Sequence, residues 1–304
     1  MVQAESGQGA QQDDPVAGRA VSVNILKGGV GKSAISMNLA DRLAARGHSV
    51  LYMDLDPNGH VTYGLGFDEV YQDRDHDLGD VILDNPSKDP EDVIYDTEWG
   101  FDFVPASVRL EELDTGLKST SYSSQRLHSK FLKPLMADNR YDYCVMDGGG
   151  ERSKIADNAF YAAKQTIIPI EPGAECLSGF KRTWQRIIQP LREYQPFEIL
   201  AIVPNKLSQR IDHQNSDREL IEYLNTSTQF AENVPNFARV TPEQLEQIDA
   251  GEVRPLPKPG IRKDSDFSKA YQEGMPVAHY NEESSTIEHL DELAAIVENG
   301  GVSR

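Results

Sequence analysis

The chain has 304 residues, enough for one large α/β domain, and 38% of them are hydrophobic, which is adequate for a core. Aspartate and glutamate number 49 against 30 lysines and arginines, and the resulting net charge of −19 argues against a surface that attracts nucleic acid or acidic membranes. Two cysteines without a C-x-x-C pair exclude a disulfide scaffold and give no metal framework, and no apolar run is long enough to span a membrane.

The acidic residues are spread along the whole chain, which is why we hypothesise a halophilic source. In molar salt, charges are screened beyond ~3 Å, so a strongly acidic surface is tolerated there. A protein that stays folded and soluble in low salt would count against this hypothesis. The two cysteines, Cys144 and Cys176, lie in apolar segments and are expected to be buried thiols.

Residues 1–19 are polar and are expected to form a disordered tail. An apolar run, residues 21–26, predicts the first strand, and a helical pattern covers residues 33–46. Between them stands Lys27-Gly28-Gly29-Val30-Gly31-Lys32-Ser33. Strand, glycine-rich turn, GK[ST] and helix is the arrangement of a phosphate loop, in which Lys32 would reach the β- and γ-phosphates and Ser33 would hold Mg²⁺.

The early lysine makes the motif more specific, because KGGVGKS resembles the deviant Walker A of the ParA/MinD family of ATPases. The resemblance implies an α/β fold with a doubly wound, mostly parallel sheet and helices on both faces, and ATP with Mg²⁺ as cofactors. It implies that Lys27 crosses a dimer interface to the nucleotide of the other subunit, as an arginine finger does. The implied nucleotide-binding residues are Gly28, Gly29, Val30, Gly31, Lys32, Ser33 and Ala34. Relatives often carry a second threonine where this chain has Ala34.

A second strand, residues 49–53, is followed by DLDPNG, which resembles the first switch of the family. By that match, Asp56 would orient the attacking water and Asp54 would support Mg²⁺ through its water ligands. Both follow the carboxyl end of a strand, where open α/β sheets bind ligands. An acidic turn cap is the alternative interpretation.

Residues 68–96 are acidic and rich in turn formers, with a short helix expected at 78–83. A strand is expected at 101–105, and helices are expected at 110–113 and 124–137.

YDYCVMD, residues 141–147, is an apolar strand that ends in aspartate, the Walker B pattern. Asp147 would therefore bind Mg²⁺ through water. The family usually continues with threonine or serine and prolines, but this chain has Gly148, Gly149 and Gly150. Because glycine loosens a loop, we expect a second switch more flexible than is usual.

A strand at 165–170, a long helix at 173–194 and a strand at 198–203 are expected next. Lys181, Arg182 and Arg186 fall near one another on that helix. By resemblance, Asn205 stands where the family's adenine-contacting asparagine does; a turn asparagine is an equally weighted alternative.

A helix is expected at 214–224, and residues 241–259 look like an insertion relative to short ParA proteins. Residues 260–277 resemble the family's closing segment. A terminal amphipathic helix at 287–297 is acidic, so packing against the sheet is favoured over membrane binding. The ATPase domain would span residues 20–299, before a tail at 300–304.

The function that the resemblance implies is a ParA-type ATPase for plasmid or chromosome partition. An ATP-dependent homodimer would bind DNA non-specifically, and a ParB-like adaptor would stimulate slow hydrolysis and release. DNA contacts would come from Arg262, Lys263 and Lys258, with Arg254 and Lys269 nearby; a solvated face is the plainer interpretation. The expected location is cytoplasmic, and on the nucleoid when ATP is bound.

Two alternatives stay open. One is a MinD-like positioning ATPase that acts on a membrane or a protein cluster. The other is a metabolic enzyme of the same fold, such as a dethiobiotin-synthetase relative, although those enzymes lack the lysine at position 27.

Overall fold

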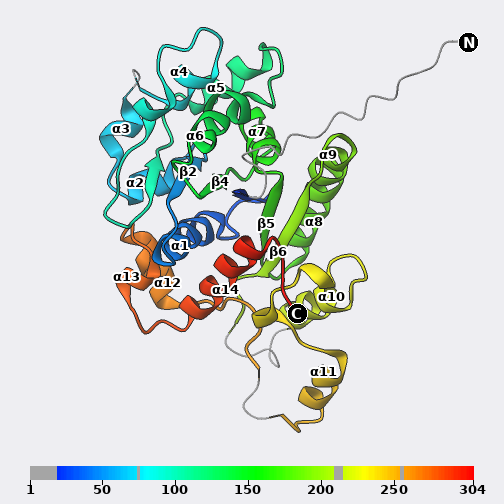
Figure 1. Ribbon diagram of the computed structural model, residues 1–304. Helices are drawn as coiled ribbons and strands as arrows, with labels where there is room; N and C mark the ends of the chain where they lie inside the picture. The colour runs from blue at the N-terminus through cyan, green and yellow to red at the C-terminus, as the bar shows by residue number, and fades with distance from the viewer. Residues whose placement is uncertain (1–18, 74–75, 209–214, 254–256) are drawn as a thin grey trace, which may run out of the picture.

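A computed structural model describes residues 19–73, 76–208, 215–253 and 257–304 of the chain. Its centre is a six-stranded, all-parallel sheet with the strand order β3-β2-β4-β1-β5-β6 (Figure 1). The strands are β1 (Ala20–Val23), β2 (Val50–Leu55), β3 (Asp102–Val104), β4 (Tyr143–Gly148), β5 (Gln165–Ile170) and β6 (Glu198–Pro204). The doubly wound α/β fold expected from the sequence is confirmed.

The central strands are buried on both faces, as continuous apolar runs require in a parallel sheet. Because all strands are parallel, their carboxyl ends lie at the same edge of the sheet. The register places Val23 and Asp54 beside Asp147 at that edge. The first strand is shorter than expected and ends at Val23, because residues 24–27 leave the sheet to begin the phosphate loop.

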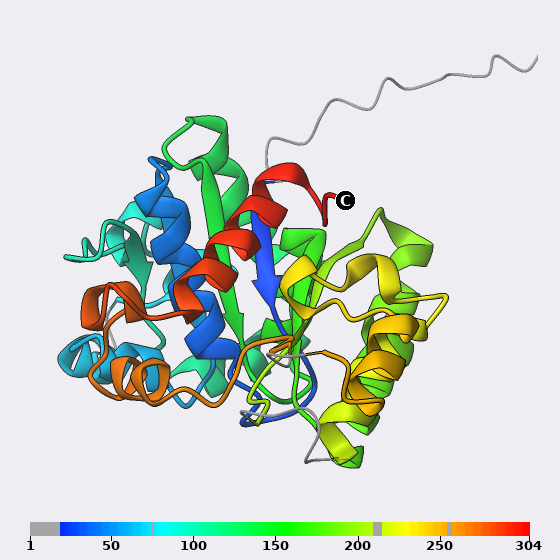
Figure 2. The same cartoon turned by 90° about the horizontal axis from the view of Figure 1, so that it is seen from below.

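Two helical layers cover the sheet. The fourteen α-helices among the described residues are α1 (Lys32–Ala45), α2 (His60–Gly64), α3 (Asp68–Gln72), α4 (Leu78–Ile82), α5 (Leu110–Lys118), α6 (Lys133–Ala137), α7 (Lys154–Ala163), α8 (Ala174–Thr183), α9 (Gln189–Tyr194), α10 (Asn215–Thr226), α11 (Pro242–Asp249), α12 (Ser265–Gln272), α13 (Val277–Tyr280) and α14 (Thr286–Asn299). Helices α1 and α14 lie side by side on one face (Figure 2), while α5, α7 and α8 pack on the other.

Several expected helices differ in length. The helix expected at 110–113 extends to Lys118, and the one expected at 124–137 begins only at Leu127, as a π-helical segment that continues into α6. The long helix expected at 173–194 is present as α8, a π-helical segment (Trp184–Ile188) and α9. The π-helical turns explain why a simple 3.6-residue pattern misplaces its boundaries.

The expected insertion at 241–259 stays a prediction, and its residues 254–256 lie outside the described ones. It contains α11, whose Leu245 and Ile248 form a small apolar cluster with Leu207, Ile221 and Val240. Terminal helix α14 buries its apolar face against α1, β6 and the apolar core on that face of the sheet. The expectation that it packs on the sheet is confirmed. No helix in the described part of the chain is long and apolar enough to cross a bilayer.

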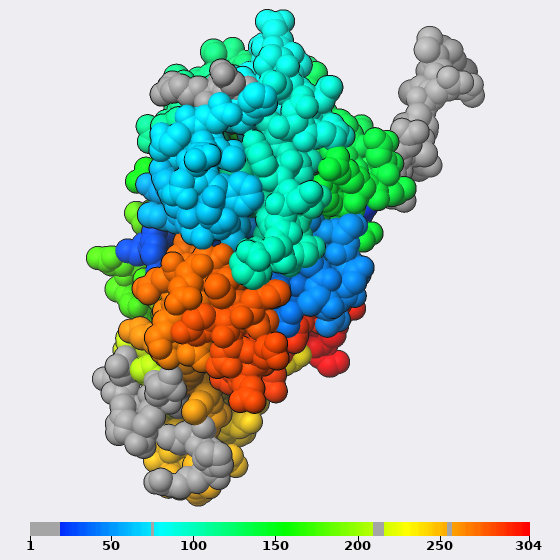
Figure 3. Space-filling view, turned by 90° about the vertical axis from the view of Figure 1, so that its left-hand side faces the viewer, coloured from blue at the N-terminus to red at the C-terminus, as the bar shows by residue number. Residues whose placement is uncertain are grey.

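Helices α12 and α13 pack in the same apolar core as α1. Figure 3 shows their orange surface beside the cyan surface of residues that follow β2. Gly274 has a φ of 68°, and a side chain there would strike the backbone of Gly64 at the end of α2. Glycine at 274 therefore permits a close backbone approach between two segments far apart in sequence.

Of the two expected tails, the described residues contact the domain. Residues 1–18 lie outside the described residues, whereas Arg19 donates hydrogen bonds to the carbonyls of Met136, Tyr141 and Asp142. At the other end, the Arg304 guanidinium donates to Val234 O at 3.1 Å. The 300–304 segment is thus packed on the domain.

Candidate nucleotide site

The phosphate loop connects β1 with α1. Gly29 and Gly31 have φ values of 78° and 89°, in the left-handed region that favours glycine. Gly31 is the N-cap of α1, which begins at Lys32. The loop therefore gathers backbone N–H groups and the positive end of a helix around one place, which is the geometry of an anion site.

Lys32 is held inside the loop. Its Nζ donates to the carbonyl oxygen of Lys27 at 3.0 Å, and the residue is only 5% exposed. Burial lowers the pKa of Lys32, while the charges of Asp147 and Asp56 oppose that shift. An ammonium group carries three donors, so this buried cation has the capacity to bind an anion at the loop.

Lys27 turns the other way, toward the rim. Its Nζ lies 2.8 Å from Glu175 Oε2 in the first turn of α8. The Lys27 side chain is 27% exposed and the Glu175 side chain 88% exposed. The hydrogen bond and charge of Glu175 raise the pKa of Lys27.

Asp54, the penultimate residue of β2, is buried beside Asp147 at the carboxyl edge of the sheet. Its carboxylate accepts the Thr62 N–H at 3.0 Å, the Thr62 hydroxyl at 2.7 Å and the Asp56 N–H at 3.1 Å. Burial raises the pKa of Asp54 to about 6 despite these hydrogen bonds. The contacts fix the loop between β2 and α2, and the predicted support of Mg²⁺ by Asp54 stays a prediction.

Asp147, in register with Asp54, is fully buried, and neither carboxylate oxygen has a hydrogen-bond partner among the described residues. Burial, and then the charge of Asp54, raise the pKa of Asp147 well above its ordinary value. The nearby Ser33 hydroxyl and the positive charge of Lys32 act in the opposite direction. An unsatisfied carboxylate beside a hydroxyl is an oxygen donor set that suits a hard divalent cation. Ser33 and Asp147 thus fit the predicted Mg²⁺ site.

Asp56 lies in the first switch and lines the cleft. Its Oδ1 accepts the Asn58 N–H at 3.0 Å and the Asn58 side-chain amide at 2.8 Å, which fixes the orientation of the carboxylate. Its role in placing water stays a prediction.

Packing constrains two of the three glycines at positions 148–150, the first of which ends β4, in a way that the sequence did not reveal. A side chain at Gly148 would overlap the buried amide of Asn24, and one at Gly150 would lie 3.0 Å from Gly28 Cα. At Gly149 the nearest neighbour would be 3.8 Å away. Two of these glycines therefore let the second switch lie directly against β1 and the phosphate loop, in addition to any flexibility they give.

Asn205, at the end of β6, is buried and bound to the loop. Its Nδ2 donates to Val30 O at 2.8 Å, and its Oδ1 accepts the Lys206 N–H at 2.9 Å. A side chain at Gly31 would overlap this amide. Contact with adenine stays a prediction, and it requires Asn205 to exchange these bonds.

A cleft of about 1220 Å³ surrounds the loop. Its described lining includes the basic residues Lys27, Lys32, Arg152, Arg182, Arg186, Lys206, Arg262 and Lys263. The acidic residues of that lining are Asp56, Glu151 and Asp264. A cleft with an excess of cations in a protein of net charge −19 indicates an anionic ligand.

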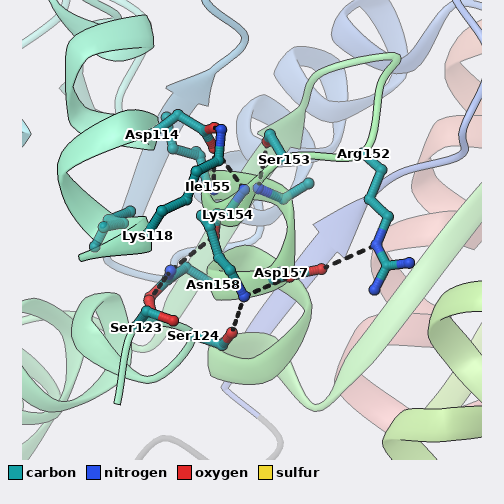
Figure 4. A network of polar contacts seen from close by, with 12 residues as sticks. Asp114, Lys118, Ser123, Ser124, Arg152, Ser153, Lys154, Ile155, Asp157 and Asn158 are labelled. Carbon is teal, nitrogen blue, oxygen red and sulfur yellow. Dashed lines mark hydrogen bonds and ion pairs between the residues drawn. The ribbon is translucent and has the colours of Figure 1, made fainter. Parts of the chain in front are cut away.

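A polar network anchors the far end of the second switch, at the start of α7 (Figure 4). Asp114 of α5 accepts the Ile155 N–H at 3.2 Å and also the Lys154 N–H. Asn158 accepts the Leu127 N–H at 3.0 Å. The switch is therefore held at both ends, at Gly148 and at the start of α7.

Residues 18–197 match the AAA domain family AAA_31. The chain is 26% identical to the maintenance of carboxysome distribution protein A of Synechococcus elongatus, over 83% of this chain and 89% of that protein. It is 31% identical to the chromosome partitioning protein ParA of Caulobacter vibrioides, over 56% of this chain and 63% of that protein. The chain belongs to the ParA/MinD family of P-loop ATPases.

The solved ATP complex of a Cyanothece McdA variant shares this family fold, with a TM-score of 0.67 at 21% identity over 94% of this chain and 97% of that one. ATP and Mg²⁺, the predicted cofactors, agree with the ligands in solved structures of this fold.

The predicted DNA-binding residues of this ParA/MinD family member differ in their exposure. Lys258 and Lys263 are exposed. Arg262 donates to the carbonyl of Ser208, and its Nε and Nη2 are buried without a partner among the described residues. Arg254 lies outside the described residues. Contact of Arg262 with DNA stays a prediction that requires the guanidinium to move outward.

Sequence reasoning missed several residues that line the cleft. Tyr271 of α12 lies beside Ser33, and burial raises the pKa of its hydroxyl to about 12. Lys206 donates to the carbonyl of Gly29. For Arg182 and Arg186 a signal existed in their spacing on one helix, whereas nothing in the sequence placed Tyr271 near the loop.

Proposed function

We propose that this protein is a ParA-type ATPase in which ATP binding closes a homodimer and slow, partner-stimulated hydrolysis reopens it. The observation that carries the proposal is the cationic cleft, with one lysine held inside the phosphate loop and a second at its rim. Two cations at different depths suit a triphosphate that is bound by one subunit and also touched by another.

Each residue has a defined part in this proposal. Lys32 binds the β- and γ-phosphates, and Ser33 and Asp147 hold Mg²⁺. When bound, Mg²⁺ neutralises phosphate charge. Asp56 positions the water whose oxygen forms the new bond to the γ-phosphorus as the bond to ADP breaks. Lys27 of each subunit stabilises the charge that develops on the nucleotide of the other.

The test is light scattering after size exclusion, with and without ATP. The expected result is a monomer that becomes a dimer with ATP, and a Lys27→Ala variant that stays monomeric while still binding ATP. Lys130→Ala, an exposed lysine outside the cleft lining, is the matched control. A Lys27→Ala variant that dimerises normally would contradict the proposal.

We further propose that the dimer binds DNA without sequence preference through Lys258, Lys263 and Arg262, and that a ParB-like adaptor releases it. If about six phosphates are neutralised, a tenfold rise in salt lowers affinity by roughly five orders of magnitude. A mobility-shift assay over a range of salt concentrations, with and without ATP, tests this. DNA binding that is equally strong without ATP would contradict the proposal that ATP controls it.

A second candidate, positioning of a protein cluster, is favoured by the match that covers 89% of the carboxysome distribution protein. Dimerisation with ATP but no DNA shift, together with co-sedimentation with a protein assembly, would favour it. Liposome co-sedimentation tests the membrane form, against which the packing of α14 on α1 argues.

A further inference from the structure

Helix α8 organises the entry to the phosphate loop with three residues spaced four apart. Glu175, Gly179 and Thr183 share one helix face by this spacing. The buried Thr183 hydroxyl oxygen accepts the Leu26 N–H at 2.9 Å, which ties the start of the loop to the helix.

Gly179 lets the stem of Lys27 lie against α8. A Cβ at position 179 would stand 3.1 Å from Lys27 Cβ and 3.2 Å from Leu26 O, closer than a side chain normally packs. One turn earlier, Glu175 meets the Lys27 ammonium at 2.8 Å. The helix therefore sets both the path of the Lys27 side chain and the place of its charge.

This placement conflicts with the proposed role of Lys27. An ammonium held by a carboxylate of its own subunit is partly neutralised, and a phosphate of another subunit must compete with that carboxylate. Glu175 is 88% exposed, so the ion pair is weak and open to exchange.

We propose that Glu175 is a positioning residue, which holds Lys27 on α8 of its own subunit until dimerisation breaks the ion pair. The inference rests on the proposed nucleotide-dependent dimer. It assigns Glu175 the effect of restraining dimerisation, because each dimer must break two such pairs.

The experiment compares wild type with Glu175→Gln, which keeps the shape of the side chain and removes its charge. Sedimentation velocity with saturating ATP, over a series of protein concentrations, gives the concentration at half-dimerisation. We expect a value about two- to tenfold lower for Glu175→Gln. Glu193→Gln, an exposed carboxylate on α9, should leave it unchanged. An unchanged or higher value for Glu175→Gln overturns the inference.

Salt supplies a readout that a merely structural role would not move. The ratio between wild type and Glu175→Gln should shrink toward one as salt rises to 1 M, where the Debye length is ~3 Å. A ratio that ignores salt counts against the inference. Lys27→Ala with Glu175→Gln should behave as Lys27→Ala alone. If neither wild type nor Glu175→Gln dimerises with ATP, the proposed function fails; if only the difference between them is absent, this inference fails alone.

Discussion

Asp147 and Asp142, at opposite edges of the sheet, have contrasting surroundings. At the carboxyl edge, Asp147 is buried without a hydrogen-bond partner among the described residues, and its pKa is raised. At the amino edge, Asp142 accepts the Ser49 N–H at 2.9 Å and the Ser49 hydroxyl at 2.8 Å, and these bonds lower its pKa. The amino edge is already satisfied, whereas the carboxyl edge keeps polar capacity for a ligand. A buried carboxylate with a raised pKa and no hydrogen-bond partner among the described residues marks the carboxyl edge as the candidate functional site, without reference to any relative.

The largest expected effect follows from Lys32→Ala. Without the ammonium, the phosphate charge at the loop is no longer offset, so hydrolysis should fall by about 10³-fold or more, together with ATP affinity. Thermal stability should hold, because the variant removes a charge whose burial is unfavourable. Hydrolysis assays and ATP titration check this, with the exposed Lys130→Ala as control. Retained ATP affinity would show that the cleft is not the nucleotide site.

Asp147→Asn and Asp142→Asn test the comparison between the edges directly. Asp147→Asn should lower Mg²⁺-dependent hydrolysis by about 10²-fold and raise the free energy of unfolding by about 1–2 kcal/mol, because it removes a buried charge next to Asp54. Asp142→Asn should cost about 0.5–1 kcal/mol, since its side chain is exposed, and leave hydrolysis unchanged. Chemical denaturation and hydrolysis assays measure both. If both variants changed hydrolysis and stability alike, the proposed difference between the two edges of the sheet would be wrong.

The pH dependence of stability should separate the two kinds of carboxylate. The folded pKa of Asp54, about 6, exceeds the ordinary 3.8, so its stabilising contribution is complete below pH ~4 and is lost as pH rises through 6. The free energy of unfolding should therefore rise on going from pH 7 to pH 5, by about 1–1.5 kcal/mol.

Carboxylates with lowered pKa values act in the opposite sense. Asp142 and Glu298, whose pKa the hydrogen bond from Arg46 lowers to about 2, contribute stability above pH ~4 that is lost as pH falls toward 2. Urea titrations at several pH values should thus show a maximum near pH 4–5. Asp54→Asn should flatten the slope between pH 5 and 7, and an unaltered slope in that variant would assign the effect to another group.

The last expected effects are on stability alone and concern the glycines of the second switch. Gly148→Ala should destabilise the fold by about 1–3 kcal/mol, because the methyl group overlaps Asn24, and the added change Asn24→Ala should restore part of that loss. Gly149→Ala, whose nearest neighbour would be 3.8 Å away, is the matched control and should change stability by less than about 1 kcal/mol. Thermal melts compare the three. Equal losses at 148 and 149 would favour loop flexibility over packing.

Much of this fold was predictable because its signals are local. Apolar runs that end in Asp54 or Asp147 have few alternatives to buried parallel strands, and GK[ST] between a strand and a helix defines the loop. Boundaries were less predictable where a π-helical turn changes the period, as before α6 and α9. The position of Tyr271 could not be foreseen, because it depends on how α12 packs beside α2.

The sequence by itself determined the phosphate loop, the two switch aspartates and the order of strands and helices, since glycine, charge and apolar period act over a few residues. Only the tertiary structure decided where the two loop lysines point, why positions 148 and 150 must be glycine, and that Asn205 and Arg262 are engaged inside the domain. These outcomes depend on which segments meet across the sheet edge, and burial and charge then act between residues more than a hundred positions apart, such as Lys27 and Glu175.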